Sequence, residues 1–453
     1  MQAKQNKKNT IITADDLKTL RPSVLWTQFK REPAYFWFIC GYLFIEYVRP
    51  QSVQPVLDIM PYAQIFILLS IVSLFTEKNI YKVSLATNKL IVGFALVMCV
   101  SMLQGYFGVF ELDKLVDRYL VWVVVYFLII HIVNDDKRFF IFFTLYVLWN
   151  IKMTQHGFKS WAMSGFGFTS YGVSCGPGFF QNSGECGAQM AVFVPLSLTF
   201  CVGLKGFITG WKYKLLWLLP VSAMATAIAS SSRGAVLACA VAVLWLTIKS
   251  PYRVKALASF VLVGVLALAV IPDEFMERFE SAGDDDTSKS RLMYWENGLD
   301  MMKKYPVLGV GFAQWLPYYA RFYPVSNLYG VQLPHNIFIE VGAELGYVGL
   351  SVFLLLIFNT LYVNYKTRKI CGNKDTFIFY MAHGFDAAML GFLVAGFFVT
   401  ITYYPYFWVN LAFTVALHIS TRRKYANAKD TKSKKKKTDR HNNTMGQTRP
   451  VKL

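Results

Sequence analysis

The sequence predicts an all-α polytopic membrane protein with about twelve transmembrane helices. Of its 453 residues, 55% are hydrophobic and 17% are aromatic, while only 16% are charged. Apolar stretches recur along the chain at close to the length of about 20 residues that a bilayer-spanning helix needs. Because a backbone exposed to lipid must satisfy its own hydrogen bonds, we expect these stretches to be helices.

The expected spans form two groups around one long outer segment. Helices one to nine fall within 34–271 and helices ten to twelve within 336–420, with the large loop 272–335 between them. The N-terminal segment 1–33 is expected not to be a removed signal peptide, because it is too long and polar and lacks a small-residue cleavage site. The basic tail 421–453 is expected to be disordered. The twelve spans are 34–48, 62–76, 90–110, 119–134, 139–153, 186–204, 213–230, 234–248, 256–271, 336–364, 378–400 and 402–420.

The basic residues predict the orientation. If both termini are cytoplasmic, the segments on that face hold 34 of the 46 Lys and Arg residues, in line with the cationic excess of cytoplasmic loops. The net charge of +19 comes mostly from this face, above all from the tail sequence TKSKKKKTDR. Such a tail needs only water and anionic lipid headgroups, so we expect no nucleic-acid partner. The outer face keeps two sizeable segments, 154–185 and 272–335, and long loops are more often functional than idle.

Cysteine and carboxylate patterns give no metal site. Cys175 and Cys186 flank the outer sequence CGPGFFQNSGEC and could pair in an oxidising compartment, although Cys186 could instead lie within the next helix. No CxxC or similar metal-ligand spacing occurs. The run 284–286, DDD, offers ligands for Mg²⁺ or Mn²⁺, but carboxylates flanked by Gly and Ser more often mark a solvated loop. We expect neither a metal nor another cofactor.

Three arginines of the outer face are candidate anion-binding residues. Arg233 lies in ASSSRGAVLAC, between a span that ends outside and one that starts inward. A guanidinium there either reaches for the interface or meets an anion. Arg291 begins the run 290–304, whose apolar residues recur at helical spacing and predict an amphipathic surface helix. Ser288 or Ser290 would be its N-cap. Arg321 lies in PYYARFYP, among aromatic residues that suit a membrane interface.

His335 is the candidate general base. A proline precedes it, and Asn336 can cap the apolar helix that follows. At the water-facing mouth of a span, an imidazole of ordinary pKa near 6.5 can exchange protons; a capping or packing role is the alternative. Glu340 and Glu344 follow one turn apart on one face. Carboxylates at that depth must face protein or water, and Arg233 is their candidate partner.

The stretch HNIFIEVGAELGYVG resembles the signature of the O-antigen ligase family: His and Asn, nine residues, Gly, two residues, Gly. The resemblance includes SSSRGA at 230–235, R-x-x-x-W at 291–295 and YPVLGVGFAQW at 305–315, and it covers about 186–364. The N-terminal YLFIEYVRPQSVQP is similar to some members described as O-glycosylation ligases.

The resemblance implies a glycosyltransferase that moves a glycan from undecaprenyl diphosphate to an acceptor hydroxyl at the periplasmic face of the bacterial inner membrane. Lipid A-core is the first expected acceptor; a growing glycan, for a polymerase, or a protein Ser or Thr are the alternatives. By position, His335 matches the family's proposed base, and Arg233 and Arg291 match its diphosphate-binding arginines. Family members often carry Asn with Asp or Asn ahead of the span near 186, whereas FFQNSGECGAQ departs from this pattern. The roles of Gln181, Asn182 and Glu185 therefore stay open.

Arg321, Asn336, Glu340 and Glu344 are expected to have supporting roles. A secondary transporter would also fit twelve spans with buried charges, but the sequence shows no obvious internal repeat and predicts few broken helices. A non-catalytic assembly component and a two-carboxylate glycosidase using Glu340 and Glu344 are further alternatives. Both carboxylates lie deep in a span without a path for hydrolytic water, which disfavours the glycosidase.

Overall fold

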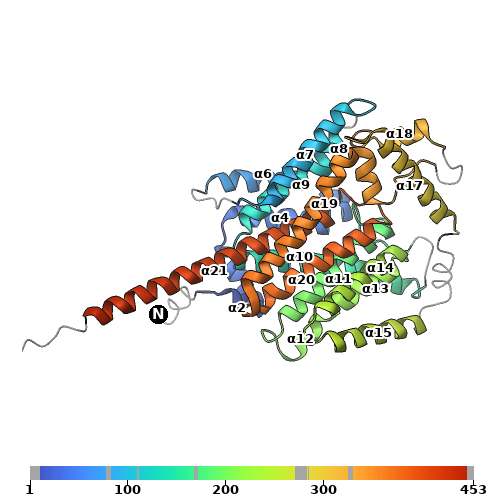
Figure 1. Cartoon of the computed structure of the whole chain (residues 1–453). Coiled ribbons are helices and arrows are strands. Elements are labelled where there is room, and N and C mark those ends of the chain that lie inside the picture. Colours follow the sequence, from blue (N-terminus) through green and yellow to red (C-terminus); the bar gives the residue numbers. More distant parts are fainter. Residues whose placement is uncertain are drawn as a thin grey trace, which may run out of the picture.

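The fold is an all-α bundle (Figure 1). The computed structural model describes residues 11–77, 83–109, 112–167, 172–270, 283, 285–324 and 330–445. It is 78% helical, and the described residues contain no β-strand, which confirms the predicted fold class. The elements are α2 (Ala14–Lys18), α3 (Pro22–Arg31), α4 (Ala34–Val48), α5 (Pro50–Val53), η2 (Pro55–Leu57), α6 (Tyr62–Phe75), α7 (Ala86–Gln104), α8 (Leu112–Leu115), η3 (Val116–Leu120), α9 (Val121–Ile132), α10 (Asp136–Met163), α11 (Ser183–Gly203), α12 (Gly210–Leu216), α13 (Leu218–Ala229), α14 (Arg233–Lys249), α15 (Arg253–Val270), α17 (Asp286–Lys304), α18 (Trp315–Phe322), α19 (Ile337–Cys371), η4 (Gly372–Lys374), α20 (Thr376–Gly396) and α21 (Pro405–Met445).

Helices occupy all twelve segments that the sequence predicts as spans. Among the described residues, five helices are long and apolar enough to cross a membrane by length and composition. They are Pro55–Phe75, Ala86–Gln104, Ser183–Gly203, Ile337–Cys371 and Thr376–Gly396. The other helices that match predicted spans are shorter, less apolar or more charged.

The helix α11 forms the centre of the bundle. Of its most apolar 18 residues 89% are buried within the protein, whereas the corresponding share for Pro55–Phe75 is 6%. Helices α13, α14 and α20 pack around α11. Close packing on α11 depends on Gly187, because a Cβ there would lie 2.5 Å from the Cβ of Ala235 on α14. The N-terminal end of α11 is therefore held directly against the start of α14.

One long helix is broken. In α19 the residue Gly346 has φ 64° and ψ −170°, which is not helical. The carbonyls freed on one side of the break accept hydrogen bonds from Val310 N (2.8 Å, to Ala343 O) and Gly311 N (3.2 Å, to Glu344 O). On the other side, Tyr347 N donates to Pro306 O at 2.8 Å. The segment 306–311 therefore replaces the missing helical hydrogen bonds.

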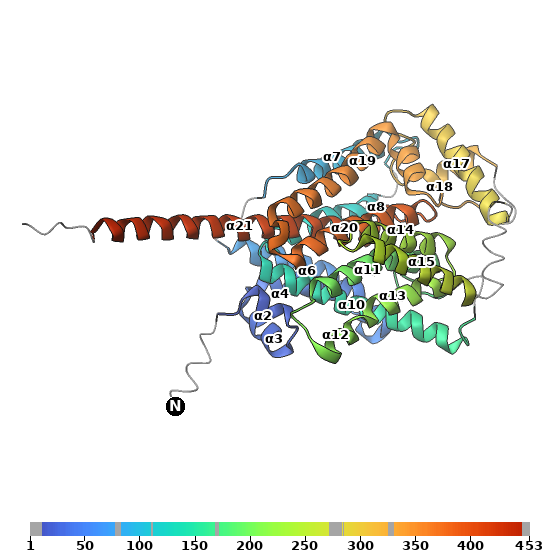
Figure 2. The same cartoon turned by 60° about the horizontal axis from the view of Figure 1, so that its bottom comes forward.

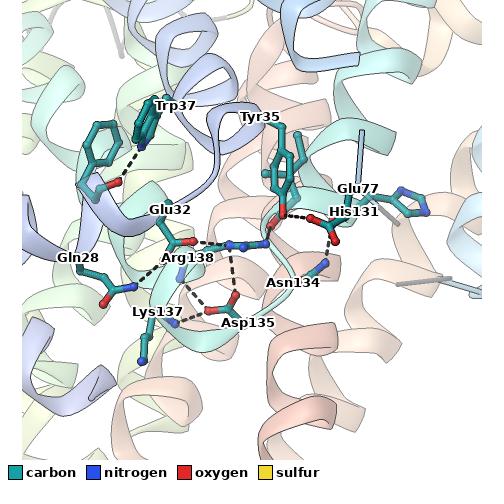
Figure 3. Close-up of polar contacts among 12 residues, drawn as sticks. Gln28, Glu32, Tyr35, Trp37, Glu77, His131, Asn134, Asp135, Lys137 and Arg138 are labelled. Atoms are coloured by element: carbon teal, nitrogen blue, oxygen red, sulfur yellow. Dashed lines mark hydrogen bonds and ion pairs between the residues drawn. The ribbon is translucent and has the colours of Figure 1, made fainter. Parts of the chain in front are cut away.

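The two ends of the bundle differ. In Figures 1 and 2, α17 and α18 lie at one end, while α2 and the projecting part of α21 lie at the other. A polar network near the start of α10 joins segments that the charge distribution assigns to the cytoplasmic face (Figure 3). At its centre, Arg138 Nε contacts Glu32 Oε2 at 2.6 Å and Asp135 Oδ2 at 3.4 Å. The candidate residues of the predicted outer face are remote from this network.

The sequence 154–185 is partly helical. The helix α10 continues to Met163, so the first ten residues of this predicted outer segment extend a span. A disulfide joins Cys175 to Cys186 in the first turns of α11. The disulfide fastens the non-helical stretch before α11 to the N-terminal end of this central helix.

Candidate active site

A cavity of about 1110 Å³ lies where four helices begin. Its walls come from the N-terminal ends of α11, α14 and α17, the residues just before α19, and the link between α20 and α21. The lining residues are Asn182, Ser183, Gly184, Glu185, Ser231, Ser232, Arg233, Gly234, Leu237, Gly283, Asp285, Thr287, Ser288, Ser290, Arg291, Gln332, Leu333, His335, Phe398, Val399, Thr400 and Tyr404. Both apolar and charged side chains therefore face one space.

Each of the four helices starts with a side-chain cap. Asn182 caps α11, Ser232 caps α14, Asp285 caps α17 and Asn336 caps α19. These are residue types that accept hydrogen bonds from the first backbone N–H groups of a helix. The positive end of each helix dipole lies at its N-terminus, so the cavity is surrounded by partial positive charges in addition to its arginines.

Arg233 begins α14 directly after a strained turn. Ser231 in that turn has φ 53°, a left-handed conformation that is costly for a residue with a side chain. The Arg233 Nη2 donates to Asp285 Oδ2 at 3.0 Å, and both side chains are about a quarter exposed (23% and 25%). The carboxylate paired with Arg233 is therefore Asp285. The predicted pairing with Glu340 or Glu344 is wrong.

Arg291 lies in the first turns of α17. Its Nε is buried and has no hydrogen-bond partner among the described residues. Burial, followed by the positive charge of Arg233, lowers the pKa of Arg291, so the two guanidiniums are close enough to repel each other. The predicted amphipathic helix is present, but its N-cap is Asp285, whose Oδ1 accepts from Ser288 N at 2.8 Å. The prediction of Ser288 or Ser290 as the cap is wrong because the helix starts earlier than its apolar pattern.

His335 lines the cavity two residues before α19. Its backbone is left-handed, with φ 51°, and its Nε2 lies 3.2 Å from Gln332 Oε1. In the tautomer in which Nε2 donates this hydrogen bond, Nδ1 carries the lone pair that can accept a proton. Burial, and secondly the charge of Arg291, lower the pKa of His335 to about 4. The imidazole is therefore neutral at neutral pH.

Comparison with known proteins finds a family match for the part of the chain that contains Arg233, Arg291 and His335. Residues 217–354 match the family described as O-antigen ligase. This match, which covers 138 of the 453 residues, supports a relationship to the O-antigen ligase family. A search of curated proteins found no match.

The O-antigen ligase match contains Arg233, Arg291 and His335, but the cavity residues from α11 and from the link between α20 and α21 lie outside it. Among them, Tyr404 Oη donates to Glu185 Oε1 at 2.6 Å. Tyr404 belongs to the link between α20 and α21, far from Glu185 in sequence. No motif in the sequence indicates this pair, which only the packing of α11 against the last helices brings together.

One of the predicted supporting residues lines the cavity, and a second caps a helix beside it. Asn182 lines the cavity and caps α11, with its Oδ1 accepting from Gly184 N at 2.8 Å. Asn336 caps α19 next to His335, as predicted, and its Oδ1 accepts from Phe338 N at 2.9 Å.

The remaining predicted residues do not line the cavity. Gln181 is exposed beside it. Arg321 is exposed on α18, with its guanidinium 5.9 Å from the ring centre of Tyr106. The two glutamates of α19 are buried and turned elsewhere: Glu340 Oε2 accepts from the hydroxyl of Thr402, and Glu344 Oε1 accepts from the backbone N–H of Trp315.

Asp285 of the DDD run is not part of a solvated loop, because it has a structural role. Asp285 caps α17 and pairs with Arg233, while Asp284 lies outside the described residues. Within the part of the chain that the structure describes, no three His, Cys, Asp or Glu side chains are grouped as metal ligands.

Proposed function

We propose that this membrane glycosyltransferase transfers a glycan from undecaprenyl diphosphate to an acceptor hydroxyl, with lipid A-core as the acceptor, at the periplasmic face of the inner membrane. The observation that carries the proposal is the meeting of two guanidiniums and one neutral imidazole on a single cavity at the start of four helices. We assign diphosphate binding to Arg233 and Arg291 and the role of general base to His335.

The proposed donor suits the charges of the cavity. A polyprenyl diphosphate glycan carries about two negative charges, and guanidinium groups bind phosphate oxygens through paired hydrogen bonds. The buried Nε of Arg291 has no other partner among the described residues, so a phosphate oxygen would satisfy it. The helix N-termini add further donors of the kind that bind phosphate groups elsewhere. Leu237 and Phe398 on the cavity wall offer apolar contacts to the first part of a polyprenyl chain.

The reaction needs little covalent work from the protein. The acceptor oxygen forms a bond to the anomeric carbon of the glycan while the bond from that carbon to the diphosphate oxygen breaks. The electron pair of the broken bond stays on the diphosphate, where the two arginines stabilise the developing charge. His335 takes the proton of the acceptor hydroxyl, a contribution of about 10²–10⁴-fold. In-line attack from the side opposite the diphosphate gives inversion at the anomeric carbon.

The pKa of His335 suggests that the donor prepares the base. Without donor, burial and the charge of Arg291 hold this pKa at about 4, which makes the imidazole a weak base. A diphosphate bound to Arg291 would offset the guanidinium charge and add negative charge nearby, and an adjacent anion raises the pKa of a histidine. The base would then become effective only in the donor complex.

The part of the cavity wall outside the two arginine-bearing helices suits the acceptor. Glu185 and Tyr404 form a hydrogen-bonded pair there, and Asn182 lines the same cavity. Carboxylate, phenol and amide groups bind sugar hydroxyls well. A polymerase that extends a growing glycan would use the same groups, and a protein O-oligosaccharyltransferase would present a Ser or Thr hydroxyl there.

A secondary transporter is the alternative class, because broken helices are frequent in transporters. In those proteins the freed backbone groups bind the substrate or its coupling ion. Here the groups around Gly346 are bonded to the segment 306–311, and Gly346 does not line the cavity. The break therefore supports a fixed scaffold better than a transport pathway.

Gel analysis of lipopolysaccharide from a deletion strain tests the proposal. Loss of all long chains with intact core and accumulation of lipid-linked polymer supports the ligase. Core that carries a single repeat unit indicates a polymerase, and an unchanged ladder points to a protein or another glycan as acceptor. Complementation with His335→Ala should fail while the protein is still made and inserted. If this variant restores the wild-type ladder, the proposed mechanism is wrong, and a transporter in which the ring only precedes a helix becomes the better reading.

A further inference from the structure

Asp285 connects the two arginine-bearing helices. Its Oδ2 accepts from Arg233 Nη2 at 3.0 Å and from the hydroxyl of Ser288 at 2.9 Å. Its Oδ1 accepts from the backbone N–H of Ser288 at 2.8 Å. A single carboxylate thus binds the guanidinium that starts α14 and caps the helix α17, which carries Arg291.

This carboxylate has the chemistry of the proposed ligand. Arg233, Arg291 and Asp285 all line the cavity, and a carboxylate and a phosphate bind the same face of a guanidinium with the same geometry. With Asp285 in place, the charge of Arg233 is already compensated. A diphosphate that engages both arginines would meet a like charge at the first of them.

On the basis of the proposed function, we propose that Asp285 is a built-in competitor of the lipid diphosphate. It holds Arg233 in the donor-free enzyme, gives this guanidinium up to a phosphate oxygen when the donor binds, and takes it back when the spent lipid diphosphate leaves. Asp285 thereby weakens donor binding and speeds product release.

Because Asp285 also caps α17, its carboxylate keeps hydrogen-bond donors when the ion pair with Arg233 breaks. When Arg233 turns to a phosphate, the two hydrogen bonds from Ser288 remain, and the positive end of the α17 dipole still faces the carboxylate. Burial alone would raise the pKa of Asp285, but the hydrogen bonds from Ser288 and Arg233 outweigh it and lower the pKa. Asp285 is therefore charged while it holds Arg233, and the hydrogen bonds from Ser288 still favour its charged form when Arg233 leaves.

A purely positional role for Asp285 makes the opposite prediction. If the carboxylate only orients Arg233 for the diphosphate, removal of its charge should weaken lipid binding. Two substitutions separate these roles, because Asn and Ser cap helices about as well as Asp does. Asp285→Asn and Asp285→Ser remove the charge and keep the cap of α17.

The experiment measures binding of undecaprenyl diphosphate to the full-length protein in lipid nanodiscs. We expect Asp285→Asn and Asp285→Ser to bind this lipid about tenfold more tightly than the wild type, the size expected when a competing ion pair worth about 1.4 kcal/mol is removed. In transfer assays the same variants should show a lower KM for the lipid-linked donor and a lower kcat, because the product leaves slowly. Unchanged or weaker binding by both variants overturns the inference.

Asp300→Asn is the matched control. Asp300 lies on the same helix, pairs with Lys304 at 2.7 Å and does not line the cavity. Its removal should leave lipid affinity within about twofold of the wild type, since a surface pair contributes little. If Asp300→Asn tightens binding as much as Asp285→Asn, the effect is one of overall charge and the inference fails.

Variants of the arginines separate this inference from the proposed function. If Arg233→Ala and Arg291→Ala abolish lipid binding while Asp285→Asn does not improve it, only the role of Asp285 is wrong. If the wild type does not bind undecaprenyl diphosphate, or binds it as well without the arginines, the proposed function fails and the inference fails with it.

Discussion

The substitution Gly346→Ala tests whether the broken helix holds the site together. A Cβ at this position would lie 2.3 Å from Val307 O and 2.4 Å from Val307 C. Both are backbone atoms, so they cannot be moved without shifting the segment 306–311. This segment directly follows α17, the helix that carries Arg291.

The expected destabilisation has two parts. The backbone of Gly346, with φ 64° and ψ −170°, lies in a region that is nearly restricted to glycine, and an Ala there costs about 1–3 kcal/mol. Shifting the segment also removes the hydrogen bond from Tyr347 N to Pro306 O, which is 2.8 Å long. Leaving this backbone donor without an acceptor costs about 1–3 kcal/mol where water does not replace the hydrogen bond. Gly346→Ala should therefore lose about 2–6 kcal/mol.

Thermal unfolding of the purified protein in detergent, at one fixed scan rate, measures this loss as a lower apparent Tm. Gly93→Ala in α7 is the matched control, because no atom lies within 4 Å of the added Cβ and Ala favours a helix by about 1 kcal/mol over Gly. We expect a clear fall in Tm for Gly346→Ala, together with at least a tenfold loss of transfer, and neither for Gly93→Ala. Equal Tm values for the two variants would refute the clamping of α19 by the segment 306–311.

Three further predictions concern the site and its surroundings. In the proposed mechanism transfer requires neutral His335, whose donor-free pKa is about 4. The value of kcat/KM should therefore stay nearly flat as the pH falls from about 7.5 to 5.5, a range over which an enzyme with a histidine of ordinary pKa would lose about tenfold. A tenfold drop would contradict the burial of this ring. The acid limb of kcat should lie at higher pH than that of kcat/KM, since kcat reports the donor complex. Arg321→Ala should change transfer less than about twofold, because Arg321 lies outside the cavity, and a loss comparable to that of Arg291→Ala would place it in the site. Cys175 and Cys186 are 11 residues apart in sequence, and replacing both with Ser should destabilise the protein by about 3 kcal/mol. In the wild type, a non-reducing mass measurement should find no free thiol at either position.

The helices were predictable because hydropathy reports burial in lipid directly. The exact form of α19 was not. The sequence of α19 contains Gly342, Gly346 and Gly349, and a glycine is compatible with a straight helix. What breaks the helix at Gly346 is the segment 306–311, about 35 residues earlier, which supplies the replacement hydrogen bonds. The conformation of one residue therefore depends on contacts that sequence periodicity does not record.

In the site, too, some features could be predicted from the sequence and others depend on contacts between distant segments. Arg233, Arg291 and His335 could be named from short motifs, and the structure brings all three to one cavity. The pairing of Arg233 was mispredicted because depth along α19 says nothing of which way Glu340 and Glu344 turn. Asp285 was read as part of a solvated acidic run, although an Asp three residues before a backbone donor such as Ser288 N is a typical helix cap.

The arrangement of caps, arginines and histidine links binding of the donor to the chemistry. A buried guanidinium without a partner for its Nε is unfavourable, and the lowered pKa of Arg291 reflects this. Burial, and secondly the charge of Arg291, lower the pKa of His335. In the proposed mechanism an anion bound to Arg291 would satisfy the guanidinium and would also raise the pKa of the imidazole. An acceptor hydroxyl that arrives first would meet a weak base and no electrophile, so this electrostatic coupling favours transfer in which the donor binds before the acceptor.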